Sequence, residues 1–495
     1  IIEHSDAKLL LVEGRFQYRK LAEIAAAAPG LQRIVGLTRP EPDERLDPRF
    51  VVAADWLAGH EKTAIPERAV TPDMLASIVY TSGTTGRPKG VMLSHDNLLF
   101  NAAAAARCAD FDENEVFLSF LPLSHTLERT GGLLLPMLLG AEVVYSRGIA
   151  QLAQDLELVR PTVLISVPRI YERVYARIQD GLANKKPIAR KLFDYAVRVG
   201  WQRFEQRQGR APWHSRLLWW PLLYGLVARR ITDKLGGRLA FAISGGAALS
   251  PDIARVFVGL GVRLYQGYGL TEASPVVCVN TPRSNIPASI GQALPGVEVR
   301  IGADNELLTR SRSVMRGYWK DEEATHAVID AQGWLHSGDQ AKRDSRGHYT
   351  LIGRIKDILV LSNGEKVPPG DIEAAILLDP LFDQVMVIGE GRPCLAALAV
   401  LNPEQWQDFA ATLGVPASAD ALADPKVGKA LTQRVAARLK DFPGYAQVRR
   451  QSATLEPWTV DAGLMTPTLK LKRKLVTERH TAAIEAMYAD FSRRH

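Results

Sequence analysis

The densest group of chemically useful side chains lies in Tyr80–Gly90, which reads YTSGTTGRPKG. Glycine lets the backbone direct its N–H groups towards a phosphate, and the hydroxyl residues between the glycines add further donors. Lys89 adds a mobile positive charge. A Walker loop has Ser or Thr after its lysine, whereas Gly90 follows Lys89 here. The stretch therefore predicts a phosphate loop of another kind, with a solvated turn between two strands as the alternative.

Two further glycine turns each follow a strand-like segment. Leu239–Ser244 runs into Gly245–Ala247, and Arg263–Gln266 runs into Gly267–Glu272, which reads GYGLTE. Ligands of α/β sheets bind outside the carboxyl ends of the strands. Glu272 is a candidate ligand for Mg²⁺, because this ion prefers one or two carboxylates together with substrate oxygens. The alternative is an acidic residue favoured by a helix N-terminus.

Three other segments carry candidate groups. Asp339 ends the sequence GWLHSGD, where a carboxylate can accept both hydroxyls of a ribose, and Arg354 follows it on a later segment. The basic stretch Thr466–Lys474 reads TPTLKLKRK, with a charged sheet edge that prevents aggregation as its alternative. His125 follows the strand-like Val116–Leu123. Taken alone it is more consistent with a structural role, because HxxER lacks metal-ligand spacing.

The candidates are spaced along alternating strand-like and helix-like segments. Leu9–Glu13 and Arg33–Leu37 are strand-like, and Tyr18–Ala28 between them is helix-like, which predicts a parallel sheet. After the first loop, Val91–Leu93 predicts a second strand, and Ser94 is a suitable N-cap for the helix that follows. Regular elements are thus expected to hold the glycine loops in place.

Composition limits the possible functions. The 495 residues exceed what one core usually serves, so two or more domains are expected. The net charge of +7 suits phosphate-bearing substrates or an anionic membrane surface better than nucleic acid. Cys108, Cys278 and Cys394 have no CxxC spacing, which argues against a disulfide framework or a zinc site and indicates a reducing compartment. The chain starts at Ile1 without methionine, so a missing N-terminal part is expected.

The sequence changes character after the segment that contains Arg354. We expect a large domain over residues 1–353, with a helical insert at about 185–238, and a small domain over residues 354–495. The longest apolar run, Leu217–Ala228, is shorter than the roughly 20 residues of a membrane-spanning helix. It is therefore expected to pack in the core, to lie at a membrane surface or to line an acyl-chain tunnel.

The motifs YTSGTTGRPKG, QGYGLTE, GWLHSGD and LIGRIKD together resemble those of the adenylate-forming superfamily, which includes acyl-CoA synthetases, luciferases and peptide-synthetase adenylation domains. LPLSHTLER, RPTVLISVPRIYERV, the helical insert and TPTLKLKRK are similar to bacterial long-chain fatty acid CoA ligases. The resemblance covers essentially the entire chain. It implies an α/β fold, with a large N-terminal domain of packed mixed sheets and helices and a small, mobile α+β C-terminal domain.

The resemblance implies a ligase that works in two steps. The carboxylate of a long-chain fatty acid attacks the α-phosphate of ATP, giving acyl-AMP and pyrophosphate, and the thiol of CoA then displaces AMP to form a thioester. Mg²⁺ is the implied cofactor, and the small domain would rotate between the steps about Lys356. A cytoplasmic location is expected. Peripheral association with the inner face of the cell membrane and a homodimer are further hypotheses, and no nucleic-acid partner is expected.

The resemblance also assigns roles to individual residues. Lys470 would bridge the attacking carboxylate and the α-phosphate, and Glu272 would be the magnesium ligand. The implied catalytic residues are Lys470, Glu272, Lys89 and Thr271. The implied acyl pocket contains His125, Gly131 and Gly132. The implied nucleotide-binding residues are Thr81, Ser82, Gly83, Thr84, Thr85, Gly86, Lys89, Gly245, Gly246, Ala247, Gln266, Gly267, Tyr268, Gly269, Leu270, Thr271, Asp339 and Arg354.

Two departures from the family pattern keep alternatives open. Some members carry a tryptophan gate near the position of His125, and this sequence lacks it, so no acyl-chain length is implied. Members also have a further segment before the position of Ile1. Besides a fatty acid CoA ligase, the sequence therefore allows a fatty acyl-AMP ligase, an acyl-carrier-protein synthetase, or a non-catalytic acyl or nucleotide binder. The complete set of implied charged residues argues against the binder.

Overall fold

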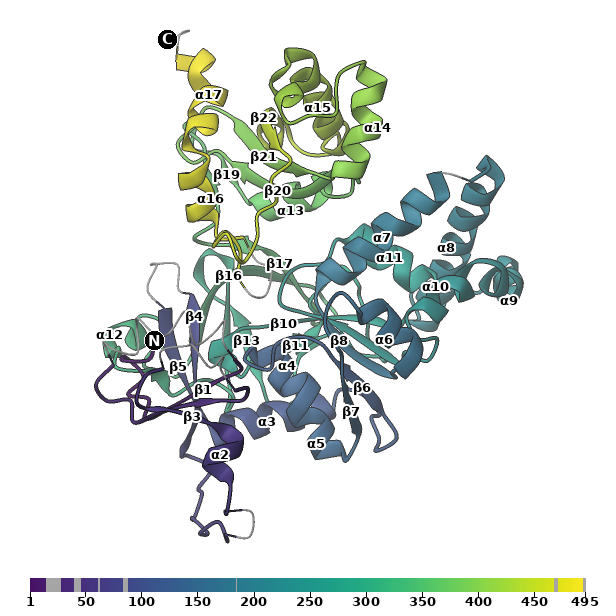
Figure 1. The fold of residues 1–495 in the computed structure, drawn as a ribbon. Coiled ribbons are helices and arrows are strands. Elements are labelled where there is room, and N and C mark those ends of the chain that lie inside the picture. Colours follow the sequence, from purple (N-terminus) through teal and green to yellow (C-terminus); the bar gives the residue numbers. More distant parts are fainter. Residues whose placement is uncertain are drawn as a thin grey trace. The chain divides into compact units, whose positions relative to one another are not determined.

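A computed structural model describes residues 1–14, 28–39, 46–60, 63–82, 88–183, 185–466 and 471–492. The chain forms two compact units, whose elements are labelled in Figure 1. The first unit comprises Ile1–Asp96 and Met315–Ala327, and the second comprises Asn97–Val314 and Val328–His495. The large α/β part with mixed sheets and the α+β C-terminal part confirm the predicted fold class.

The first unit begins with a small parallel sheet of order β1-β2-β3. Its strands are β1 (Leu9–Val12), β2 (Arg33–Gly36) and β3 (Phe50–Val52), and the short helix α2 (Ala53–Leu57) follows. The strands expected at Leu9–Glu13 and Arg33–Leu37 are thus confirmed. The helix expected at Tyr18–Ala28 lies, except for Ala28, outside the described residues.

A second sheet in this unit carries the first glycine loop. β4 (Leu75–Ser82) pairs with β5 (Pro88–Ser94) in antiparallel fashion, and β15 (Gly317–Tyr318) adds to the other edge of β5. The predicted strand at Val91–Leu93 is confirmed as part of β5. The pair is antiparallel because its connection is far too short for the crossover that parallel strands need.

The second unit is built on a seven-stranded sheet of order β12-β11-β10-β9-β8-β6-β7. Five strands are parallel, namely β6 (Val116–Ser119), β7 (Glu142–Tyr145), β8 (Val163–Ser166), β9 (Phe241–Ser244) and β10 (Leu264–Gly269). Two antiparallel strands complete it, β11 (Val276–Val279) and β12 (Gln292–Ala293). β6 is shorter than the predicted strand at Val116–Leu123, which contains Pro122, and proline cannot donate to a sheet.

Opposite faces of this sheet are covered by different helices. On one face, Leu118, Leu164, Ala242 and Leu264 pack with residues of three helices, α6 (Leu152–Val159), α7 (Pro168–Ala183) and α11 (Pro251–Gly259). On the other, Phe117, Ile165 and Tyr265 pack against the segment formed by α4 (Thr126–Glu128), the π-helix η1 (Arg129–Leu134) and α5 (Leu135–Leu139). Apolar side chains on both faces follow from the parallel arrangement.

The helical insert follows α7 and includes a long helix, α8 (Pro187–Arg207). The apolar run Leu217–Ala228 does not form one helix. It divides into η2 (Ser215–Trp219), α9 (Trp220–Leu223) and the π-helix η3 (Tyr224–Ala228), before α10 (Arg229–Lys234). Trp220 and Leu223 are buried, whereas Trp219 and Leu222 are more than half exposed. Among the described residues, no helix is both long and apolar enough to cross a membrane.

An antiparallel sheet of order β13-β14-β16-β17 follows in the second unit. Its strands are β13 (Glu298–Ile301), β14 (Glu306–Arg310), β16 (Leu335–Arg343) and β17 (Tyr349–Arg354). A turn over residues 355–357 contains Lys356, which is exposed, and leads to the small pair β18 (Leu359–Val360) and β19 (Lys366–Val367). The predicted hinge residue therefore lies directly after β17.

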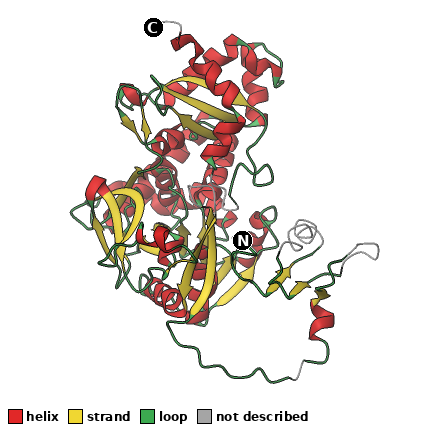
Figure 2. Ribbon diagram, turned by 90° about the vertical axis from the view of Figure 1, so that its left-hand side faces the viewer, coloured by secondary structure: helices red, strands yellow, loops and turns green. Residues whose placement is uncertain are grey.

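The C-terminal part folds around β21 (Leu395–Leu401), all seven residues of which are buried. It pairs with β20 (Phe382–Ile388) and β22 (Val448–Thr454). One face of β21 packs on α13 (Pro369–Ile376), α14 (Pro403–Leu413) and α15 (Pro425–Arg438), and the other packs on α16 (Arg473–Arg479) and α17 (Thr481–Ser492). Figure 2 shows the helices beside these strands.

Candidate functional site

Asp339 is the centre of the best-defined polar cluster among the predicted site residues. Antiparallel pairing of β16 with β17 places it directly opposite Arg354, whose Nε donates to Asp339 Oδ1 at 2.8 Å. The hydroxyl of Tyr268, from β10, donates to Oδ2 at 2.5 Å. Only 6% of Asp339 is exposed. Two predicted ribose-binding residues are thus brought into direct contact with one residue of the motif GYGLTE, which lies near the end of β10 because the strand continues to Gly269 rather than ending at Gln266.

The groups around Asp339 hold its carboxylate in one orientation. Burial, reinforced by the adjacent Asp339 carboxylate, raises the pKa of Tyr268 well above its usual value, so its hydroxyl remains a donor. Burial lowers the pKa of Arg354, but Asp339 outweighs this effect and the net pKa is raised. Ser337 Oγ also accepts the N–H of Asp339. A carboxylate has about four acceptor positions, so Asp339 keeps capacity for hydroxyl groups of a ligand.

Glu272 lies in a short turn that close packing defines. The turn is a 3₁₀ segment, η4 (Thr271–Ala273), directly after β10. A Cβ added to Gly269 would lie 2.1 Å from the carbonyl oxygen of Pro275, so only glycine fits where the chain enters the turn. Glu272 itself is half-buried. Among the described residues, no group of three or more His, Cys, Asp or Glu side chains could enclose a metal ion.

Two buried polar residues that we did not predict hold this turn. Asn101, on α3 (His95–Ala106), donates through Nδ2 to the carbonyl oxygens of Ala273 and Val276 at 3.2 and 2.8 Å. Its Oδ1 accepts the N–H of Val276 at 3.1 Å. Thr130 Oγ1, from η1, donates to the carbonyl oxygen of Ser274 at 3.0 Å. The one sequence feature that could have indicated this role is that Asn101 directly precedes a run of alanines in the predicted helix.

Gln266 and the turn after β9 support one another. Gln266 Oε1 accepts the N–H of Leu249 at 3.2 Å, and its Nε2 donates to the carbonyl oxygen of Pro287. The predicted nucleotide-binding side chain is therefore engaged inside the protein. Gly246 has a φ of +80°, which favours glycine, and a Cβ on Gly245 would make a tight contact with the Leu127 side chain at 3.2 Å.

The first glycine loop, Tyr80–Gly90, belongs to the first of the two compact units. Thr81 lies opposite Lys89 in the β4–β5 ladder, and Lys89 Nζ lies 4.8 Å from the centroid of the Tyr318 ring. This is a cation–π contact within that unit. The remaining loop residues, Gly83, Thr84, Thr85 and Gly86, and the distant Lys470 lie outside the described residues.

The predicted acyl-pocket residues lie at and after the N-terminus of α4. His125 is its N-cap, and its Nδ1 accepts the N–H of Leu127 at 3.3 Å. A Cβ on Gly131 would lie 3.1 Å from Ile165, and a Cβ on Gly132 would lie 2.3 Å from a carboxylate oxygen of Glu128. The two glycines thus allow η1 to approach β8 and Glu128 closely.

Glu128 is a buried carboxyl group that the sequence analysis did not select. Its exposed fraction is 0%, and no described group makes a hydrogen bond of normal geometry with either oxygen. Burial raises the pKa of Glu128 to about 7, and the nearby Ser119 hydroxyl only partly opposes this effect. The sequence feature that could have indicated Glu128 is its position three residues after the candidate residue His125, on the same short helical segment.

Replacing Glu128 with glutamine should remove a pH dependence of stability. Between the usual pKa of 4.5 and the folded-state value of about 7, the folded protein keeps a proton that the unfolded chain loses. The wild-type free energy of unfolding therefore falls with rising pH across this window, by about 3 kcal/mol relative to Glu128→Gln. Denaturant unfolding of both proteins from pH 4.5 to 8 measures the difference. Parallel pH profiles for the two proteins would contradict a buried, protonated Glu128.

The sequence matches two protein families by profile. Residues 1–319 match the family described as AMP-binding enzyme, and residues 356–492 match the AMP-binding enzyme C-terminal domain. The long-chain-fatty-acid–CoA ligase FadD15 of Mycobacterium tuberculosis is 31% identical over 495 residues, covering 99% of this chain and 81% of that protein. The long-chain-fatty-acid–CoA ligase ACSBG1 of Rattus norvegicus is 30% identical, covering 98% of this chain and 72% of that protein.

Solved structures share the fold. The adenylation domain of a carboxylate reductase from Mycobacterium chelonae has a TM-score of 0.74 and 25% identity, covering 99% of this chain and 74% of that one. The anthranilate CoA ligase AuaEII, solved in complex with anthranoyl-AMP, has a TM-score of 0.71 and 21% identity, covering 98% of this chain and 80% of that one. With the family match over most of the chain, these findings establish that the protein belongs to the family of AMP-binding enzymes.

Proposed function

We propose that this protein ligates a long-chain fatty acid to CoA at the expense of ATP, through an acyl-adenylate and with release of AMP and pyrophosphate. The observation that carries the proposal is the Asp339 carboxylate, fixed between Tyr268 and Arg354. Such a group suits the two hydroxyls of a ribose. Relatives named as long-chain-fatty-acid–CoA ligases support the choice of substrates.

Different groups of residues would have different roles in the adenylation step. Asp339 would bind the ribose, and the turns after β9 and β10 would receive adenine and the α-phosphate. Glu272 would hold Mg²⁺ together with phosphate oxygens, which fits a single half-buried carboxylate on a rigid turn. The ion would neutralise phosphate charge as the fatty acid carboxylate approaches. Lys89 and the glycine loop would hold the departing pyrophosphate.

The proposal also includes a division into two domains, association with a membrane, a homodimer and a cellular location. A large domain over residues 1–353 and a small domain over 354–495 would change their orientation between the two steps, with Lys356 in the turn after β17 as the hinge. Lys470 would act in the first step only. The exposed apolar side chains of Leu218, Trp219 and Leu222 support peripheral attachment to a membrane. A homodimer and a cytoplasmic location remain part of the proposal.

A pyrophosphate-release assay tests the reaction. Release from ATP that depends on an added straight-chain fatty acid supports adenylation, and a series of acids gives the preferred chain length. Supplying CoA or an acyl-carrier protein and identifying the product then separates a CoA ligase from a carrier-protein synthetase. Accumulation of acyl-AMP with both acceptors would identify an acyl-AMP ligase. Pyrophosphate release that no fatty acid stimulates would favour a non-catalytic binder.

Asn101→Ala should weaken the use of Mg²⁺ by loosening the turn that carries Glu272. The change removes three hydrogen bonds to the backbone of Ala273 and Val276. We expect a loss of stability of about 2–4 kcal/mol and a higher Mg²⁺ concentration for half-maximal pyrophosphate release.

Asn97→Ala is the matched control for this prediction. Asn97 lies on the same helix and donates to the carbonyl oxygens of Arg312 and Val314, a segment that meets the Glu272 turn through the hydrogen bond from the Ser274 hydroxyl to Ser313. Asn97→Ala should lose stability with a smaller change in the Mg²⁺ requirement, because its link to the turn is indirect whereas Asn101 bonds the turn itself. The same shift in Mg²⁺ requirement for both variants would show that Asn101 acts only on overall stability.

A further inference from the structure

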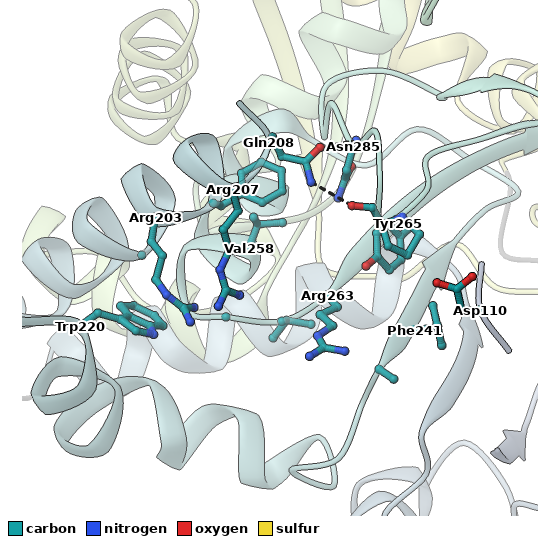
Figure 3. A pocket seen from close by; sticks show the side chains of 16 residues that line it. Asp110, Arg203, Arg207, Gln208, Trp220, Phe241, Val258, Arg263, Tyr265 and Asn285 are labelled. Atoms are coloured by element: carbon teal, nitrogen blue, oxygen red, sulfur yellow. Dashed lines mark hydrogen bonds between the residues drawn. The ribbon is translucent and has the colours of Figure 1, made fainter. Parts of the chain in front are cut away.

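A cavity of about 460 Å³ lies at the amino ends of strands β9 and β10 of the seven-stranded sheet. The glycine turns lie at the opposite ends of these strands. The lining of the cavity includes Phe241, at the start of β9, and Arg263, directly before β10. Most of the other lining residues come from the helical insert, the end of α11 with the turn after it, and the loop containing Asn285, and Asp110, Ala240 and Tyr265 complete the lining (Figure 3). The cavity is therefore distinct from the proposed nucleotide site.

Three arginines give this cavity a strongly positive lining. Arg203 and Arg207 lie one turn apart on α8, and their side chains extend towards the same side of the cavity as Arg263 (Figure 3). No described residue forms an ion pair or a hydrogen bond with any of these three guanidinium groups. Asp110, the one carboxylate in the lining, contacts Arg283 instead, at 3.2 Å. The cavity thus gathers positive charge without a matching carboxylate.

The positive charges of the three arginines in the cavity repel one another. Burial, together with the positive charges of Arg207 and Arg263, lowers the pKa of Arg203. Like charges four residues apart on a helix repel each other. Arg210, just beyond the same helix, shows the usual arrangement, because Glu205 accepts from its Nε and Nη2 at 2.9 and 2.8 Å. An anion between the three arginines of the cavity would replace repulsion with attraction.

An aromatic side chain orients one of the three arginines. The guanidinium of Arg203 lies 5.4 Å from the centroid of the buried Trp220 ring. Such a contact orients the planar guanidinium, which suits two-pronged binding of phosphate oxygens. The volume lies within the usual range for small-molecule sites, roughly 300–1,000 Å³, and exceeds what a bare phosphate needs. The cavity therefore has room for a phosphate-bearing ligand larger than a bare phosphate ion.

We propose that this cavity binds a phosphate-bearing ligand, with its anionic oxygens held by Arg203, Arg207 and Arg263. The inference does not depend on the ligase reaction. The ligand has two possible sources, a soluble phosphate compound and the headgroup of an anionic lipid. Trp220 belongs to α9, and its neighbours Trp219 and Leu222 are 57% and 53% exposed. Apolar side chains beside the cavity are compatible with the lipid source.

The double variant Arg203→Gln/Arg207→Gln tests the site against the matched pair Arg190→Gln/Arg198→Gln. The control removes two exposed arginines from the same helix, outside the cavity lining, and makes the same change in net charge. Calorimetry with pyrophosphate probes the soluble source, and flotation with phosphatidylglycerol vesicles, compared with phosphatidylcholine vesicles, probes the lipid source. Pyrophosphate can also enter the proposed nucleotide site. The measured quantity is therefore the binding that Arg203→Gln/Arg207→Gln loses and Arg190→Gln/Arg198→Gln keeps.

We expect at least a tenfold loss of affinity for one of the two probes in Arg203→Gln/Arg207→Gln and less than a twofold loss in the control. Loss towards pyrophosphate alone identifies a soluble ligand, and loss towards phosphatidylglycerol vesicles alone identifies a lipid headgroup. Should the double variant misfold, Arg263→Gln changes an exposed residue on another element and should weaken the same probe. Unchanged binding of both probes, or equal losses in the control pair, would overturn the proposal.

Discussion

Asp339→Ala is expected to reduce fatty-acid-dependent pyrophosphate release by about a hundredfold or more, chiefly through a higher KM for ATP. Hydrogen bonds to a charged group contribute about 1.5–3 kcal/mol each, and the carboxylate would make two of them with the ribose. Two such bonds correspond to roughly a hundredfold or more in kcat/KM. Initial rates at varied ATP concentration measure the effect.

The same change should also destabilise the fold, so a second variant is needed to separate the two effects. Asp339→Ala leaves the buried hydroxyl of Tyr268 and the Nε of Arg354 without their acceptor, at a cost of about 1–3 kcal/mol. Tyr268→Phe removes one donor to Asp339 and keeps the Arg354 contact. It should lose about 1 kcal/mol of stability and less than tenfold in rate. Equal rate losses in the two variants would show that Asp339 acts as a structural residue.

The resemblance indicated Asp339 and Arg354 as candidate ribose-binding residues, but it predicted neither their direct contact nor the third member of the cluster. Both residues stand in short motifs, GWLHSGD and LIGRIKD, on strands joined by one turn, and antiparallel pairing then places them opposite each other. Tyr268 joins them from a position 71 residues away in the sequence. Its motif indicated a ligand-binding turn, but no local pattern indicates which distant carboxylate a tyrosine will contact.

Buried polar groups were the main features that the sequence did not reveal. Glu128, Asn101 and Thr130 are polar residues on helices, where most such residues face water. Their burial follows from how η1 and α3 pack against β8 and the Glu272 turn, which is a long-range property of the fold. Gln266 illustrates the reverse case, because a residue in a ligand-binding motif uses its amide group to support the neighbouring loop.

The apolar run Leu217–Ala228 shows the limit of hydropathy as a guide. Its composition was compatible with the core, a membrane surface or a tunnel. The structure divides it into 3₁₀, α and π segments, so buried Trp220 and Leu223 alternate with exposed Trp219 and Leu222. A change of helix type alters which residues share a face, and a single helical period could not have predicted this pattern.

Lys470→Ala is expected to abolish acyl-AMP formation while leaving thioester formation from supplied acyl-AMP nearly unchanged. In the first step a carboxylate anion approaches an anionic phosphate, and a positioned ammonium group lowers the energy of the developing charge. Loss of one such donor reduces the rate by about a hundred- to a thousandfold. The second step has a thiol attacking a mixed anhydride, and rotation of the small domain would have removed Lys470 by then.

Lys474→Ala provides the control for this asymmetry. Lys474 lies in the same basic segment, its side chain is 83% exposed, and it forms a long ion pair with Glu478 at 4.0 Å. Both half-reactions should keep their rates in this variant, because an exposed pair contributes little. Comparable losses of both half-reactions in Lys470→Ala would mean that the lysine supports the fold or both steps. Loss of the first alone requires that different residues serve the two steps, which is the result that the proposed rotation of a small domain between the steps would produce.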